Sequence, residues 1–107
     1  MPHRREKLPE LLKHLAAEFI EREKVSRALI TVTDAALSES GEKAKILVTV
    51  YPESEEKAAL ESLKRQKRYF LEYVDMHARI GRIPSVAFDI DEGEKNRQRI
   101  EFLSQNH

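Results

Sequence analysis

The 107-residue sequence contains no cysteine, no tryptophan and only three glycines. The absence of cysteine excludes disulfides, thiolate nucleophiles and cysteine-ligated metals. The glycines do not cluster, so there is no glycine-rich loop of the kind that holds phosphates. No apolar run is long enough to span a bilayer, and the charged start MPHRREK leads into an amphipathic stretch, unlike a secretory signal. We therefore expect a soluble, cytoplasmic protein.

Charge of neither sign dominates, since 19 lysines and arginines balance 19 aspartates and glutamates. This balance hides two segments of opposite charge. Residues 64–82 carry six cations and two acids, whereas residues 84–94 carry four acids and no cation. A binding partner responds to the local potential as well as to the total charge. The zero net charge therefore does not exclude a polyanionic partner.

The first half of the chain predicts a helix followed by a strand pair. A chain of this length is expected to form one domain over residues 1–107, with a core at about 7–91 and a tail or short helix at 92–107. Apolar residues recur every three or four positions over 6–24, and Pro9 places the start of this helix near Lys7, because proline fits best in the first turn. Strands are predicted at 28–33 and 43–51, and the short turn between them favours antiparallel pairing, because so short a link cannot easily make a parallel crossover.

A long helix is predicted over 54–80, with Ser54 as N-cap and Gly81 as its stop. Its apolar stripe is interrupted at Gln66-Lys67-Arg68, which indicates either a bend or a lysine that extends along apolar surface. A third strand over 85–91 can pair in parallel after this crossover. The order α-β-β-α-β, with a three-stranded mixed sheet packed on helices and a possible short C-terminal helix, is an α+β fold.

Three segments, in this order and spacing, resemble the ribosome-binding factor A family of bacterial ribosome assembly proteins. Residues 29–38 (LITVTDAALS) are similar to the family's first strand and its exit, and residues 44–50 (AKILVTV) to its second strand. Residues 76–84 (MHARIGRIP), followed by VAF, are similar to the basic end of its long helix, its Arg-x-Pro step and its last strand. The chain is identified as a short, divergent member of this family.

The resemblance implies a type II KH-like fold that binds the free or immature small (30S) ribosomal subunit and its 16S rRNA. It also implies a non-enzymatic role late in 16S rRNA processing, important in the cold. No cofactor, metal, membrane or small-molecule substrate is implied, and we expect a monomer.

The sequence departs from the family pattern at two places. The family has an Ala-x-Gly kink in its long helix, where other KH domains hold single strands with a Gly-x-x-Gly loop. The aligned residues here are Gln66, Lys67 and Arg68, so this motif is not carried over as a site. The family's Asp-Pro-Arg before the first strand is here Val25-Ser26-Arg27, which keeps only the arginine.

A cluster of six cations is the candidate rRNA-binding site: Lys64, Arg65, Lys67, Arg68, Arg79 and Arg82. Such cations position a phosphate backbone without reading its sequence. A solvated helix face is the alternative, and the resemblance favours RNA contact. Tyr69 and Tyr73 lie one turn apart beside the cations and are candidates for stacking on bases. For Tyr69 the preferred interpretation is a residue at the core edge with a solvated hydroxyl.

Metal ligation is not indicated. Asp89 and Asp91 form an Asp-x-Asp pair on one face of a predicted strand, but no third acid stands at a diagnostic spacing, so a solvated strand end is preferred. The four histidines lack the spacing of zinc ligands and are expected at the surface: His3, His14, His77 and His107.

Two other functions stay open. The fold could serve as a protein-interaction or dimerisation module without RNA contact, through an open sheet edge or the face that carries Leu47 and Tyr51. The zero net charge and the missing Ala-x-Gly motif favour this alternative. A small enzyme that uses Asp34, Asp89 and Asp91 is disfavoured, because few polar groups accompany them.

Overall fold

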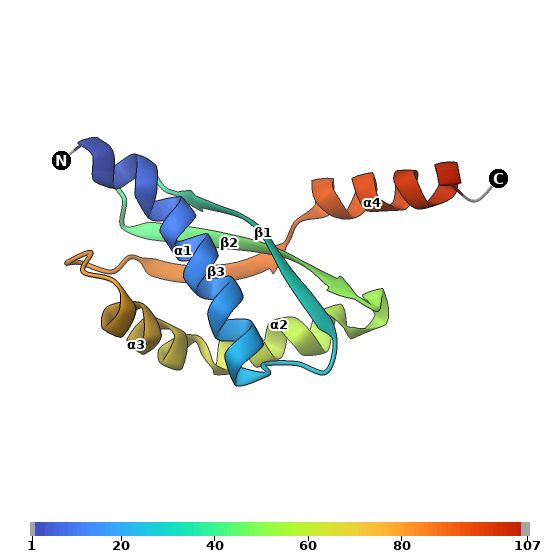
Figure 1. Cartoon of the computed structure of the whole chain (residues 1–107), viewed down its shortest axis with the longest axis horizontal. Coiled ribbons are helices and arrows are strands. Elements are labelled where there is room, and N and C mark those ends of the chain that lie inside the picture. Colours follow the sequence, from blue (N-terminus) through green and yellow to red (C-terminus); the bar gives the residue numbers. More distant parts are fainter. Residues whose placement is uncertain (1, 106–107) are drawn as a thin grey trace.

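The computed structural model describes the backbone of residues 2–105 and the side chains of residues 7–104. Four helices, three strands and one 3-10 turn follow each other along this part of the chain (Figure 1). They are α1 (Pro2–Glu23), β1 (Leu29–Leu37), β2 (Lys43–Tyr51), η1 (Glu53–Glu55), α2 (Glu56–Arg65), α3 (Lys67–His77), β3 (Ser85–Ile90) and α4 (Glu92–Gln105). The predicted α+β class is confirmed, and the segment expected as a tail or short helix forms a helix of 14 residues.

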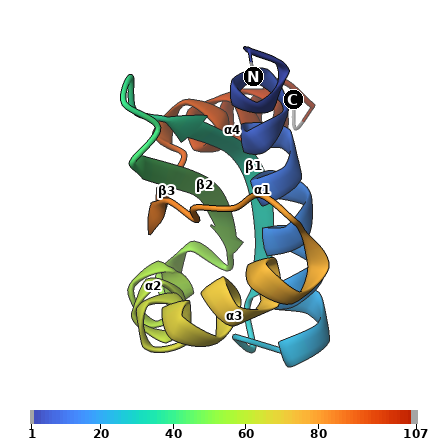
Figure 2. The same cartoon turned by 90° about the vertical axis from the view of Figure 1, so that its left-hand side faces the viewer.

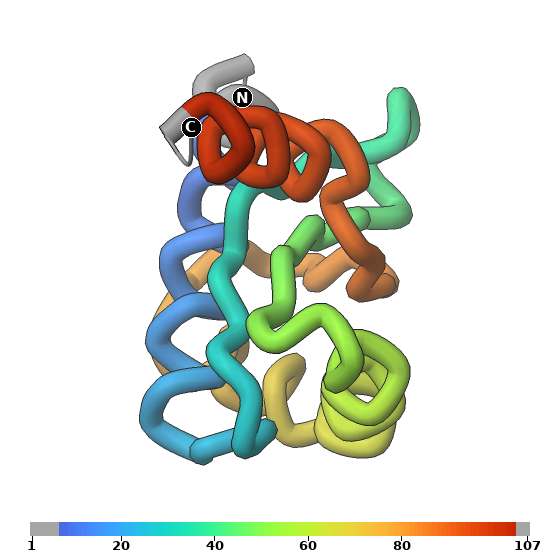
Figure 3. The backbone as a smooth tube through the Cα atoms, turned by 90° about the vertical axis from the view of Figure 1, so that its right-hand side faces the viewer, coloured from blue at the N-terminus to red at the C-terminus, as the bar shows by residue number. Residues whose placement is uncertain are grey.

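The sheet is mixed, as predicted. Its strand order is β1-β2-β3, with β1 antiparallel and β3 parallel to the central β2. The sheet lies between α4 and the pair α2 and α3, and α1 runs along β1 (Figures 2 and 3). Alternate residues of β2, among them Ile46 and Val48, are buried on the side of α1, α2 and α3. This topology agrees with the type II KH-like fold that the resemblance implied.

Phe70 joins three elements of the core. Its side chain is fully buried, and its ring centroid lies 5.5 Å from that of Phe19 on α1 and 5.6 Å from that of Phe88 on β3. Tilted and edge-on ring pairs at this separation stabilise a core beyond the area that they bury. Phe70 therefore fixes the first turn of α3 against both α1 and the sheet.

The first helix starts earlier than predicted. It begins at Pro2 and contains Pro9 in its interior, so the prediction that Pro9 sets the start near Lys7 is wrong. An interior proline removes one backbone hydrogen bond, at a cost of about 3 kcal/mol. Leu8 and Leu12 are buried on either side of Pro9, and burying such a side chain contributes about 1.5–3 kcal/mol. Packing of this half of α1 offsets the cost of the proline.

The predicted long helix is two helices. Gln66 has φ −98° and ψ 5°, which ends α2 and begins α3, so the polar interruption is a bend. The Gln66 backbone N–H donates to the Ser62 carbonyl at 3.1 Å, and the buried Ser62 hydroxyl donates to the Val25 carbonyl at 2.5 Å. The end of α2 is thus tied to the segment between α1 and β1. The chain forms the break without the small residues of an Ala-x-Gly motif.

Both ends predicted for that long helix are also corrected. Ser54 lies in η1, and neither η1 nor α2 begins with a side-chain cap. At the other end α3 stops at His77, because Ala78 is extended with φ −145° and ψ 140°. Gly81 has φ 71° and lies in the loop beyond, where a left-handed backbone favours glycine.

Strand β1 continues to Leu37, beyond the predicted residues 28–33, and contains a bulge. The register shifts between Val32 and Asp34, so Thr33 is an extra residue opposite β2. Before the bulge the core side carries Ile30 and Val32, and after it the core side carries Ala35. A one-residue shift exchanges the two faces of a strand, which hides the second half of β1 from a period-two pattern.

Asp91 is the N-cap of α4. Its Oδ1 accepts a hydrogen bond from the Glu94 backbone N–H at 3.0 Å, and its Oδ2 accepts one from the Thr33 hydroxyl at 2.6 Å. The interpretation of Asp91 as a solvated strand end is therefore wrong, whereas Asp89 is exposed. The segment Asp-x-x-Glu at the start of α4 matches a capping pattern, and the bulge at Thr33 holds the cap in place.

Replacing Phe70 with alanine is expected to lower the free energy of unfolding by about 3–5 kcal/mol, because it leaves a cavity between α1, α3 and β3. The neighbouring exposed Tyr69 supplies the control: Tyr69→Ala should change it by about 0.5 kcal/mol or less. Urea denaturation followed by circular dichroism measures both. Equal losses for the two variants would show that Phe70 does not hold the core together.

Candidate nucleic-acid interface

Four of the six candidate cations flank the break between α2 and α3. Lys64 and Arg65 are the last residues of α2, and Lys67 and Arg68 are the first of α3. Lys64, Arg65 and Arg68 are exposed, and Lys67 is half-buried. Among the described side chains, only Arg68 of these four has an ion pair, with Glu72, whose Oε1 lies 3.7 Å from Nε. We call these four residues the junction cations.

Arg79 and Arg82 form a separate group. Both are exposed in the loop between α3 and β3, at the other end of α3 (Figure 1). An α-helix of 11 residues is about 16 Å long, and α3 carries the exposed acids Glu72 and Asp75 between the two groups. The six cations therefore form two groups, one at each end of α3.

The two tyrosines have different environments. Tyr69 is 58% exposed, more than expected of a residue at the core edge. Tyr73 is only 8% exposed; its ring stacks on His77 at 4.0 Å and its hydroxyl donates to Glu18 at 3.1 Å. Of the two stacking candidates, Tyr69 alone offers a ring to a partner, and Tyr73 is a core residue.

A groove of about 420 Å³ lies where α1 and α3 meet, beside the junction cations. We call it the α1–α3 groove. Its lining consists of Phe19, Glu23, Gln66, Tyr69, Glu72, Tyr73 and Met76. Sequence reasoning missed it, because the residues of α1 that complete it lie more than 40 positions away from those of α3. The sequence signal that could have indicated the groove is the spacing of Tyr69, Tyr73 and Met76, which lie on one face of a helix.

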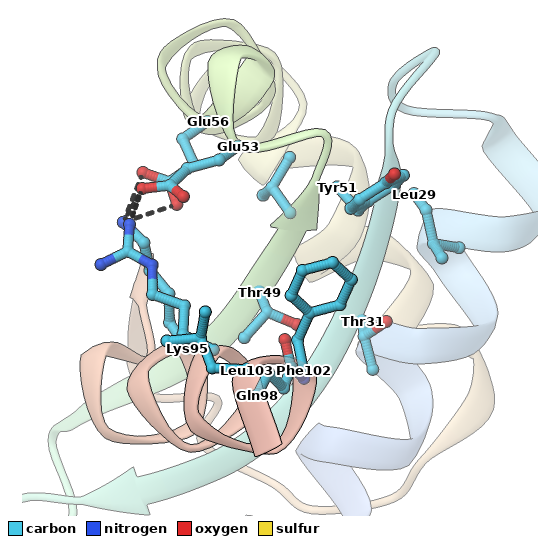
Figure 4. A pocket seen from close by; sticks show the side chains of 12 residues that line it. Leu29, Thr31, Thr49, Tyr51, Glu53, Glu56, Lys95, Gln98, Phe102 and Leu103 are labelled. Carbon is cyan, nitrogen blue, oxygen red and sulfur yellow. Dashed lines mark hydrogen bonds and ion pairs between the residues drawn. The ribbon is translucent and has the colours of Figure 1, made fainter. Parts of the chain in front are cut away.

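A second groove, of about 620 Å³, lies between α4 and the sheet face opposite α1 (Figure 4). Leu29, Tyr51, Phe102 and Leu103 supply its apolar lining, and all four are exposed. Leu29 and Tyr51 are direct partners in the β1–β2 register. The sheet face on which Leu47 and Tyr51 suggested an open interface is thus partly covered by α4.

The family model for ribosome-binding factor A matches residues 4–104. The chain belongs to this family. A ribosome-binding factor A of Synechococcus sp. is 31% identical over 106 residues, which cover 94% of this chain and 77% of that protein. The break at Gln66 stands where the resemblance places the family's Ala-x-Gly kink.

Solved structures agree with this assignment. The crystal structure of ribosome-binding factor A from Thermus thermophilus has a TM-score of 0.73 and 29% identity, and covers 80% of this chain and 93% of that chain. A homology model of the T. thermophilus factor, fitted into a cryo-EM map of a 30S complex, has a TM-score of 0.66 and 29% identity, and covers 76% of this chain and 88% of that chain.

In this member of the family, ion pairs attach α4 to η1 and to the start of α2. Lys95 Nζ lies 2.9 Å from Glu53 Oε1 and 2.9 Å from Glu56 Oε2, and Arg99 pairs with Glu53. The hydrogen bond from Arg99, followed by that from Lys95, lowers the pKa of Glu53 to about 2. Glu53 and Glu56 in turn raise the pKa of Lys95. Glu53 is the common acceptor that connects η1 to α4.

The remaining candidate polar residues do not come together as a site. His14 pairs with Glu18 at 2.7 Å, and the His77 ring lies 2.9 Å from the Tyr73 carbonyl, whereas the side chains of His3 and His107 lie outside the described residues. Asp34 and Asp89 each accept a hydrogen bond from the next residue's backbone N–H. Over side chains 7–104 no three His, Cys, Asp or Glu residues are grouped as metal ligands.

No helix in the described part of the chain has the length and apolarity to cross a bilayer.

Glu53 should keep α4 attached well below the pH at which a free glutamate is neutralised. A carboxyl whose pKa is lowered on folding stabilises the fold above its unfolded pKa, here 4.5, and this stabilisation is lost as the pH falls through about 2. Titration of the Glu53 carboxyl carbon by NMR measures the midpoint, and Arg99→Gln should move it upward. A midpoint near 4.5 in the unmodified protein would contradict the ion-pair arrangement.

Proposed function

We propose that this protein binds the small (30S) ribosomal subunit and contacts its 16S rRNA through the junction cations, Lys64, Arg65, Lys67 and Arg68. We further propose that it acts late in 16S rRNA processing, without catalysis, and that this role matters in the cold. Membership of the ribosome-binding factor A family supports the proposal, as does the related T. thermophilus protein whose model was fitted into a 30S complex.

The observation that carries the proposal is that the junction cations are concentrated at the surface and have almost no ion-pair partners among the described side chains. Four positive charges lie within five residues at a surface bend, and the described side chains neutralise one of them, weakly, through an exposed pair. Exposed pairs of this kind contribute about 0–1 kcal/mol, so Arg68 can exchange Glu72 for a phosphate at little cost. Each phosphate contact releases condensed counterions, which makes such binding strongly salt-dependent.

Arg79 and Arg82 extend the proposed contact along the rRNA rather than adding to the same phosphates. They lie one length of α3 from the junction, about 16 Å, which corresponds to several nucleotides of an RNA strand. We propose that the two groups of cations hold separate points of one rRNA segment. A contact at two points fixes the orientation of the protein as well as its position.

Binding alone can promote maturation in this proposal. A protein that binds one arrangement of immature rRNA more tightly than another shifts the population toward the first by that difference in affinity. No nucleophile or metal is required. The continuous cluster of buried hydrophobic residues supports one domain over the described chain, and we propose that it works as a cytoplasmic monomer.

Reversing two junction charges tests the proposal. Lys64→Glu with Arg65→Glu should weaken co-sedimentation with purified small subunits by about tenfold or more, and make the slope of log affinity against log salt shallower by roughly 1 to 2. The matched control is Lys43→Glu with Lys45→Glu, two exposed lysines at the start of β2. Circular dichroism checks that both variants fold.

Unchanged binding by the Lys64 and Arg65 variant, or equal losses in the two variants, would contradict the proposal. The first result would mean that the junction does not contact the subunit. The second would mean that binding depends on the total charge of the protein and has no defined site.

A further inference from the structure

We propose that the α1–α3 groove binds a single unpaired nucleobase of the RNA, stacked on Tyr69, with the base's exocyclic amine bonded to Glu72 or Glu23. This inference rests on the proposed function, because it takes the RNA held by the junction cations as the source of the nucleotide. It adds a base-reading element to a contact that phosphates alone would leave without sequence preference.

The floor and wall of the groove suit a flat aromatic ligand. Phe19 and Tyr73 are buried and close its floor, whereas Tyr69 and Met76 stand exposed beside it. At about 420 Å³ it lies within the 300–1,000 Å³ typical of small-molecule sites, so it has room for one base. A base stacked on an aromatic side chain gains affinity from that contact alone.

The polar residues of the groove select the edge of the base. Glu23 and Glu72 place carboxylates, which only accept hydrogen bonds, on its lining, together with the amide of Gln66. Adenine, cytosine and guanine each carry an exocyclic amine that can donate to such an oxygen, and uracil does not. Uracil offers only its N3–H as a donor, and the carbonyl oxygens on both sides of it would be repelled by the carboxylates. The groove should therefore bind amine-bearing bases better than uracil.

The phosphate of the same nucleotide has a partner at the groove's edge. Glu72 lines the groove and lies 3.7 Å from Arg68, so the Arg68 guanidinium is beside the bound base. Gln66 belongs both to the groove and to the break that carries the junction cations. This charge arrangement, carboxylates within and cations next to them, matches a nucleotide, which has an amine on the base and a negative phosphate outside it.

The experiment uses the intact protein and fluorescein-labelled single-stranded oligo(A) and oligo(U) of equal length, with binding followed by anisotropy. The unmodified protein should bind oligo(A) several-fold more tightly than oligo(U). Tyr69→Ala should weaken oligo(A) binding by about tenfold, Tyr69→Phe should restore most of it, and Glu72→Gln should reduce the preference for oligo(A). The matched control is Tyr51→Ala, because Tyr51 is an exposed tyrosine of the other groove.

Three outcomes would overturn the inference. If Tyr69→Ala binds both oligomers as the unmodified protein does, while the Lys64 and Arg65 variant loses small subunits, the proposed function stands and the base site does not exist. If Tyr69→Ala loses small subunits but keeps oligo(A), the groove contacts a ribosomal protein instead. Equal effects of Tyr69→Ala and Tyr51→Ala would show that neither ring marks a specific site. If the Lys64 and Arg65 variant still binds both small subunits and oligo(A) as the unmodified protein does, the proposed function is refuted.

Discussion

The packing of Phe70 between Phe19 and Phe88 is the contact on which the proposed interface depends. Phe70 begins the buried face of α3 four residues after the break at Gln66, and it holds that helix against α1 and β3 together. The hydroxyl of Ser62 fixes the other side of the break through the Val25 carbonyl. With both flanks anchored in the core, the polar residues between them have no place inside, and the cations of the junction remain at the surface.

The C-terminal helix is attached in a different way from the rest. Its N-terminus is capped by Asp91, and Lys95 and Arg99 hold it to Glu53 and Glu56, whereas Phe102 and Leu103 remain exposed over an open apolar groove. Ion pairs with partly exposed partners contribute far less than burial of large apolar side chains. The attachment of α4 is therefore weaker than that of α1, α2 and α3, which share one apolar core.

Sequence reasoning succeeded where a pattern is local. Alternation in β2 identified the residues that face the core, and the polar interruption located the break, though the pattern alone could not separate a bend from an extended lysine. It failed where a distant contact decides the local structure. Pro9 lies inside α1 because Leu8 and Leu12 are buried there, and the second half of β1 was missed because the bulge at Thr33 reverses the pattern.

From the amino-acid sequence alone come the α+β class, the strand order along the chain, the family and the positions of the cations, since each depends on spacing or composition within a short segment. The tertiary structure decided which of those residues are accessible together. Tyr69 and Tyr73 are one turn apart and alike in sequence, yet α1 covers Tyr73 and leaves Tyr69 open beside a groove. Exposure and the shape of a groove arise from elements far apart in the chain, and only their packing determines them.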